Sequence, residues 1–116
     1  MKLKEIQALL NAKGLTGAEN PELEVHNAFS SDMMSDVLAF PREQMVLLTG
    51  LINAQVMRTA DMLDIRMVVF VRGKMPSEEA LELAKECGIS VLSTSYTMFV
   101  ASGILYTNGL NNNVKG

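Results

Sequence analysis

The amino-acid sequence predicts an α/β domain in which helices pack on a mainly parallel sheet of about four to five strands. Two patterns predict this class. Short apolar runs that suit buried strands alternate along the chain with segments whose apolar residues recur at helical spacing. Gly, Pro, Ser, Thr or Asn residues, which form turns and cap helices, mark each change from one pattern to the other. Strands that alternate with helices are joined by right-handed parallel crossovers, although the strand order does not follow from the pattern.

The first part of the chain is expected to form a helix, a strand and a short helix. Apolar residues at helical spacing predict the first helix over about residues 2–12. Apolar and polar residues then alternate with the period of a half-buried strand near 23–29. The Ser-Ser-Asp segment at 30–32 offers a cap for a short helix, which Pro41 ends.

The second part of the chain repeats a strand followed by a helix. The runs predicted as buried strands cover residues 45–49, 66–71 and 89–93. Residues suited to open the three following helices are Asn53, Pro76-Ser77 and Ser93-Thr94-Ser95. Gly88 stands where a left-handed cap ends the second of these helices. The inward face of the last helix is expected to carry Tyr96, Phe99, Val100, Gly103 and Ile104.

Composition confines the chain to one domain. Its 116 residues are 48% hydrophobic and 20% charged, which is enough for a single core. We expect residues 1–110 to form this domain and residues 111–116 to be a polar tail. The longest apolar run, Met67–Val71, is much shorter than the roughly 20 residues that cross a bilayer. We therefore expect a cytoplasmic protein with no membrane partner.

Charge and residue counts argue against several functions. The 10 basic and 13 acidic residues give a net charge of −3 with no basic cluster, which disfavours a nucleic-acid partner. One cysteine, Cys87, and one histidine, His26, cannot form a disulfide or a histidine-rich metal site. Asp32 and Asp36 could hold a cation, but a cap and a solvated carboxylate explain them more simply. Since motifs for phosphoryl transfer, zinc proteases and serine hydrolases are missing, the sequence predicts no catalytic residue, cofactor or metal ion.

Polar residues gather where the predicted strands end. The candidate ligand-binding residues are Ser31, Asp32, Thr49, Gly50, Asn53, Arg72, Ser93 and Thr94. Because the carboxyl ends of parallel strands and the helix N-termini share one edge, an anionic small molecule such as a nucleotide suits them. We expect the Thr49–Asn53 loop to lie beside Ser93 and Thr94, with Arg72 coming from a third strand. The alternative is that these residues only cap helices.

The nine methionines suggest a contact surface. Those that fall outside the predicted inward faces are Met33, Met57, Met62, Met75 and Met98. Methionine is frequent at adaptable interfaces, so a homodimer that buries several of them is expected. The equal alternative is that the inward faces are wider than drawn.

Three stretches of the sequence, at residues 48–60, 69–74 and 91–99, resemble DRTGG domains. The resemblance covers about residues 2–110 and implies the fold of the N-terminal domain of HPr kinase/phosphorylase. It implies a regulatory role without kinase activity, because the kinase chemistry of that family lies in a separate P-loop domain. The motif that names the family is replaced here by Gly50-Leu51-Ile52-Asn53-Ala54. Two functions follow: a non-catalytic regulatory or sensing module for a nucleotide or other anion, or a dimerisation and protein-interaction module without a ligand.

Overall fold

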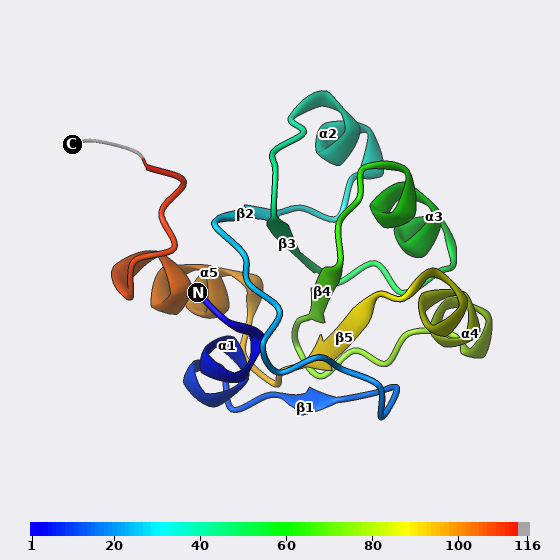
Figure 1. Cartoon of the computed structure of the whole chain (residues 1–116), viewed down its shortest axis with the longest axis horizontal. Coiled ribbons are helices and arrows are strands. Elements are labelled where there is room, and N and C mark those ends of the chain that lie inside the picture. Colours follow the sequence, from blue (N-terminus) through cyan, green and yellow to red (C-terminus); the bar gives the residue numbers. More distant parts are fainter. Residues whose placement is uncertain (114–116) are drawn as a thin grey trace.

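The computed structural model of the chain describes residues 1–113, and within them five strands form a single sheet (Figure 1). The strands are β1 (Lys13–Gly14), β2 (Asn27–Ser30), β3 (Met45–Thr49), β4 (Met67–Phe70) and β5 (Ser90–Ser93). Their order in the sheet is β1-β5-β4-β3-β2, with β2 to β5 parallel and β1 antiparallel to β5. The predicted class, a mainly parallel α/β sheet, is confirmed.

Five helices cover the two faces of this sheet within residues 1–113. They are α1 (Leu3–Leu9), α2 (Met34–Ala39), α3 (Gln55–Met62), α4 (Glu78–Cys87) and α5 (Met98–Thr107). Helices α2, α3 and α4 lie on one face, and α1 and α5 lie on the other (Figure 1). Every residue of β3, β4 and β5 is buried. The continuous apolar character of these strands therefore reflects a sheet that is covered on both faces.

Local sequence signals predict the limits of β3, β4, β5 and α4 in the second half of the chain well. The strand predicted at 45–49 is found at those residues. The one predicted at 66–71 is one residue shorter at each end, and the one predicted at 89–93 is one residue shorter at its start. Helix α4 begins after Ser77, whose hydroxyl accepts a hydrogen bond from the Ala80 N–H. It ends at Gly88 with φ of +71°, a conformation that favours glycine.

The strand predicted at 23–29 is shorter than expected, and β1 was not predicted. Only Asn27–Ser30 pairs with β3. The preceding residues pair with the N-terminal segment instead, since the Val25 N–H donates to the Met1 carbonyl and Lys2 bridges to Glu24. Strand β1 contains two residues that pair with Ser93 and Leu92, a contact made across about 80 residues of sequence. Two residues carry no periodic pattern, so such a strand cannot be read from the sequence.

The predicted inward face of the last helix is wrong in part: Tyr96 and Ile104 pack against the core, but Phe99, Val100 and Gly103 are exposed. The structure buries Ala101 and Leu105, while Phe99 is 87% exposed and Val100 is 43% exposed. The helix starts at Met98 with Thr97 as its cap, later than Ser93-Thr94-Ser95. It is apolar all round, so periodicity could not distinguish its two sides.

Among the methionines outside the predicted faces, two are corrections, because Met57 is fully buried and Met98 is partly buried against the core. Met33, Met62 and Met75 are 61%, 72% and 52% exposed. Met57 belongs to α3 and packs into the core, because the inward face of this helix is wider than the predicted apolar stripe. The exposed methionines lie on different elements of the fold, so their common burial in a dimer stays a prediction.

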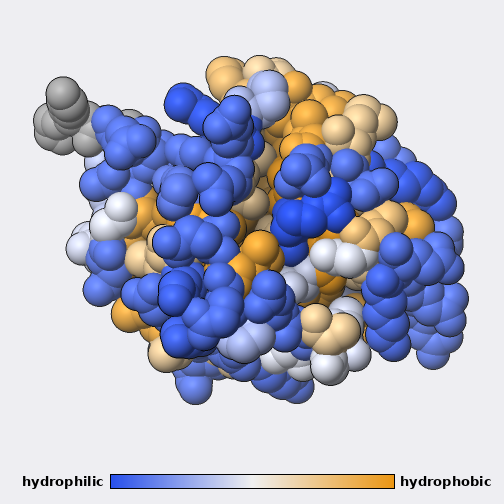
Figure 2. Space-filling view, viewed as in Figure 1, coloured by the Kyte–Doolittle hydropathy of each residue, from blue (hydrophilic) through white to orange (hydrophobic). Residues whose placement is uncertain are grey.

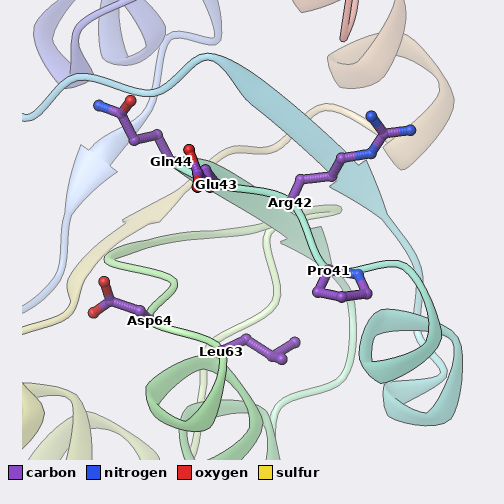
Figure 3. A pocket seen from close by; sticks show the side chains of 6 residues that line it. All are labelled: Pro41, Arg42, Glu43, Gln44, Leu63 and Asp64. Atoms are coloured by element: carbon purple, nitrogen blue, oxygen red, sulfur yellow. The ribbon is translucent and has the colours of Figure 1, made fainter.

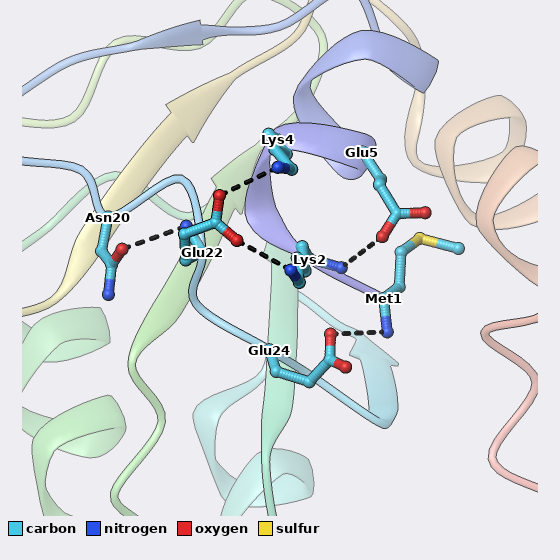
Figure 4. A network of polar contacts seen from close by, with 7 residues as sticks. All are labelled: Met1, Lys2, Lys4, Glu5, Asn20, Glu22 and Glu24. Carbon is cyan, nitrogen blue, oxygen red and sulfur yellow. Dashed lines mark hydrogen bonds and ion pairs between the residues drawn. The ribbon is translucent and has the colours of Figure 1, made fainter.

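Ion pairs anchor α1 to the segment before β2 (Figure 4). The Glu22 carboxylate accepts from Lys2 Nζ at 2.8 Å and from Lys4 Nζ at 2.9 Å. These hydrogen bonds and charges lower the pKa of Glu22 from 4.5 to about 2. All three side chains are exposed, so the network orients the segment more than it stabilises the fold.

None of the helices formed by residues 1–113 has the length and apolar character required to cross a bilayer. In the predicted polar tail, the Asn112 side chain bonds to the backbone of Ala28 on β2. Residues 114–116 of that tail lie outside the described residues, and the predicted domain boundary at residue 110 stays a prediction.

Candidate functional site

Asp32 lies at the centre of the candidate site. Its Oδ1 accepts a hydrogen bond from the Gly50 N–H at 2.6 Å and lies 3.3 Å from the Thr49 hydroxyl. Its Oδ2 lies 4.0 Å from Nη2 of Arg72. The carboxylate thus joins the loop after β2 to the loops after β3 and β4. Asp32 and Arg72 are each about half exposed, so a ligand can reach both charges.

The backbone of Arg72 is held against the loop after β5. Arg72 has φ of +58° and Gly73 has φ of +66°, which form a tight left-handed turn. The Arg72 N–H donates to the Tyr96 carbonyl, and the Gly73 N–H donates to the Thr94 carbonyl, both at 2.8 Å. These bonds fix the turn and leave the guanidinium free to face solvent.

Gly50 allows the guanidinium to approach the backbone. A Cβ at this position would lie 2.6 Å from Arg72 Nη2, closer than any ordinary contact. A side chain at residue 50 would therefore push the cation away from Asp32 and from the Gly50 N–H. Glycine at this position is favoured by the close approach of the guanidinium and not by a positive φ.

The expected neighbours of the Thr49–Asn53 loop are corrected by the strand order. Strand β4 lies between β3 and β5, so the loop after β3 meets Arg72 and Asp32, not Ser93 and Thr94. Strands β3, β4 and β5 are neighbours in the sheet in the same order as in the sequence. The loop after β3 and the loop after β5 are therefore two strands apart. The turn at Arg72 and Gly73 bridges between them.

The remaining predicted residues make local hydrogen bonds. The buried Thr94 hydroxyl donates to the Leu10 carbonyl at 2.7 Å, and the Ser93 hydroxyl donates to the Lys74 carbonyl at 3.5 Å. Side-chain oxygens of Asn53 and Ser31 accept from backbone N–H groups two residues later. The predicted caps are corrected: the N-caps of α2 and α3 are Met33 and Ala54, which make no side-chain cap bond, so Ser31 and Asn53 only order the turns before these helices. Contact of the predicted residues with a ligand stays a prediction.

Two features of this edge were missed by sequence reasoning. A hollow of about 320 Å³ beside the Arg72 turn is lined by Lys13, Gly73, Met75, Ser93 and others. Lys13 adds a second positive charge to this edge of the sheet. It was not among the predicted site residues because β1, the strand that carries it, was not predicted. Exposed apolar side chains at the same ends of the strands come from Met33, Ile52, Met75 and Phe99, which open or precede the helices there.

Other surfaces differ in character from this edge. A hollow of about 470 Å³ at the opposite edge of the sheet lies between the loop before β3 and the turn after α3 (Figure 3). Arg42, Glu43 and Asp64 give it mixed charge without a convergent set of donors. Apolar residues gather over α2 at the top of the face shown in Figure 2, and hydrophilic residues cover much of the rest.

The comparisons with known proteins support the fold. No family model matches the chain, and no curated protein matches it. A crystal structure of the CBS and DRTGG domains of the regulatory region of Clostridium perfringens pyrophosphatase, complexed with the activator diadenosine tetraphosphate, is similar, with a TM-score of 0.73 and 21% sequence identity. The match covers 98% of this chain and 50% of that one. This likeness supports a DRTGG-like α/β fold, and the chain spans half the length of its neighbour.

Proposed function

We propose that the chain is a non-catalytic regulatory module that binds a nucleotide at the carboxyl edge of its sheet. The observation that carries this proposal is the meeting of Arg72, the Gly50 N–H and Asp32 at one exposed point. Membership in the DRTGG family, and through it kinship with the N-terminal domain of HPr kinase/phosphorylase, is part of the same proposal. The nucleotide activator and regulatory role of the similar pyrophosphatase region support it.

A nucleotide suits this site better than a bare anion does. A phosphate beside the Gly50 N–H would meet the Asp32 carboxylate, and like charges repel. A nucleotide carries phosphates for the cations and ribose hydroxyls, which donate hydrogen bonds to a carboxylate. Phosphates placed over the Gly73 turn would lie between Arg72 and Lys13, since Lys13 and Gly73 line the same hollow. The Asp32 carboxylate then accepts hydrogen bonds from the ribose hydroxyls.

Calorimetric titration with ATP and with diadenosine tetraphosphate tests the proposal. Arg72→Ala should weaken binding by about 1.5–3 kcal/mol, the range for hydrogen bonds to charged groups. Arg42→Ala is the matched control, because Arg42 is an exposed arginine at the opposite edge of the sheet. Equal loss in both variants would indicate a general charge effect. Unchanged binding by Arg72→Ala would contradict the site.

A second function, dimerisation, is favoured by helix α5. The helix contains no Asp, Glu, Lys or Arg, and its outer side exposes Phe99, Val100 and Tyr106. Helices that are apolar all round are normally covered on all sides, so a second copy of the chain is proposed as the cover. Sedimentation should show a dimer that Phe99→Ser dissociates without loss of stability, because Phe99 is 87% exposed. A monomer at tens of micromolar would contradict it.

A further inference from the structure

A third hollow lies on the α5 side of the sheet, beside the edge strand β2. Its volume is about 190 Å³. The apolar walls include Leu48 of β3 and Leu105 of α5, which are both buried. The hydroxyls of Ser30 and Ser102, 2.7 Å apart, lie on its lining. The hollow is smaller than the roughly 300–1,000 Å³ of sites for drug-sized ligands, so it suits one ring system.

Asn112, one of the residues that line this hollow, bonds to the backbone of Ala28 on its β2 side. The Ala28 N–H donates to Asn112 Oδ1 at 2.7 Å, and Asn112 Nδ2 donates to the Ala28 carbonyl at 2.9 Å. Strand β2 is at the edge of the sheet, so the outward N–H and carbonyl of Ala28 have no strand to pair with. The Asn112 carboxamide satisfies both groups in the way a neighbouring strand would.

Asn112 lies in a short irregular segment that follows α5. Asn112 and Asn113 have φ of +57° and +59°, left-handed conformations that asparagine adopts more readily than most residues. The two hydrogen bonds to Ala28 span 84 positions of sequence and fix an otherwise irregular segment. A ligand that offers the same donor and acceptor can therefore replace the side chain at little cost.

We propose that this hollow binds the ring of an aminopurine such as adenine, and that Asn112 is a latch that the ring displaces from Ala28. The amino group of adenine and its adjacent ring nitrogen form a planar donor and acceptor pair, as the carboxamide does. The ring then lies between Leu48 and Leu105, with the hydroxyls of Ser30 and Ser102 in reach. This inference deepens the proposed nucleotide-binding function, on which it rests for the class of ligand.

Adenosine, which carries no phosphate, tests the hollow alone. Titration into ¹⁵N-labelled protein should shift the amide resonances of Ala28 and Ser102 and release the Asn112 side-chain amide to solvent. In Asn112→Ala the apparent affinity should rise about tenfold, the factor expected when the latch leaves the site open about a tenth of the time. Asn113→Ala is the matched control, since the Asn113 carboxamide bonds to no group among residues 1–113, and its affinity should equal that of the wild type.

Chemical analogues decide between this and other forms of binding. N6,N6-dimethyladenosine lacks the donor and should not shift Ala28. A silent Ala28 resonance, equal binding of the dimethyl analogue, or no gain in Asn112→Ala would each overturn the latch. Tripolyphosphate tests the carboxyl-edge site separately through the Gly50 and Gly73 resonances. A response to tripolyphosphate with a silent Ala28 overturns only the latch, and the reverse result overturns only the carboxyl-edge site.

Discussion

Replacing Gly50 by alanine should separate ligand binding from folding. The new Cβ would lie 2.6 Å from Nη2 of Arg72 and 3.3 Å from Oδ1 of Asp32. Because carbon contacts are comfortable only at about 3.5 Å and beyond, the guanidinium must move by about 1 Å or more. It is the far end of a flexible, half-exposed side chain, and its pair with Asp32 is worth at most about 1 kcal/mol. Stability should therefore fall by less than about 1 kcal/mol.

Binding should suffer more than stability does. If the guanidinium holds a phosphate over the Gly73 turn, its displacement should weaken ATP binding by about 1.5–3 kcal/mol, or roughly 10- to 150-fold. Calorimetry measures the binding, and urea unfolding measures the stability. Gly103→Ala is the control, because a Cβ there meets nothing within 4 Å. Unchanged ATP affinity in folded Gly50→Ala would refute the reasoning, as would a loss of stability above about 3 kcal/mol.

The other predictions concern stability. Thr94→Val leaves the Leu10 carbonyl and the Tyr96 N–H without a partner, so urea unfolding should show a loss of about 1–3 kcal/mol; a loss under about 0.5 kcal/mol would contradict this. Ser77→Ala removes the N-cap of α4 and should lower the free energy of unfolding by about 1 kcal/mol in the same assay. An unchanged free energy of unfolding would show that the cap does not stabilise the fold. The Glu22 pKa is lowered from 4.5 to about 2 on folding, so its contribution to stability is present above pH 4.5 and is lost as the pH falls toward 2. Melting temperatures of Glu22→Gln should depend less on pH across that window than those of the wild type, and parallel curves would exclude the pairing.

The parts of the fold that local chemistry specifies could be predicted. Strand β3 is a run of apolar residues whose covering on both faces follows from the lack of polar alternation. Helix α4 has an N-cap serine, an acidic first turn and a left-handed glycine at its end, so the sequence predicts both where it begins and where it ends. These signals act within a few residues and need no knowledge of the partner elements.

The parts that depend on distant contacts could not be predicted. Strand β1 exists because Lys13 and Gly14 meet β5, a pairing with no local signature. The bond between Asp32 and Gly50 depends on the pairing of β2 with β3, which brings the two loops together, although the sequence marked both residues as candidates. The inner side of α5 is selected by packing against α1 and the sheet, because the helix is apolar all round. Strand order decides which candidate residues meet.

The location of bound nucleotide tests the proposed function most directly. ATP titrated into ¹⁵N-labelled protein should shift the amide resonances of Gly50 and Arg72 most strongly, because these groups meet at the carboxyl edge of the sheet. Gln44 and Asp64, which line the hollow at the opposite edge, should remain unchanged. The largest shifts at Gln44 and Asp64, or no shift at millimolar ATP, would contradict nucleotide binding at Arg72.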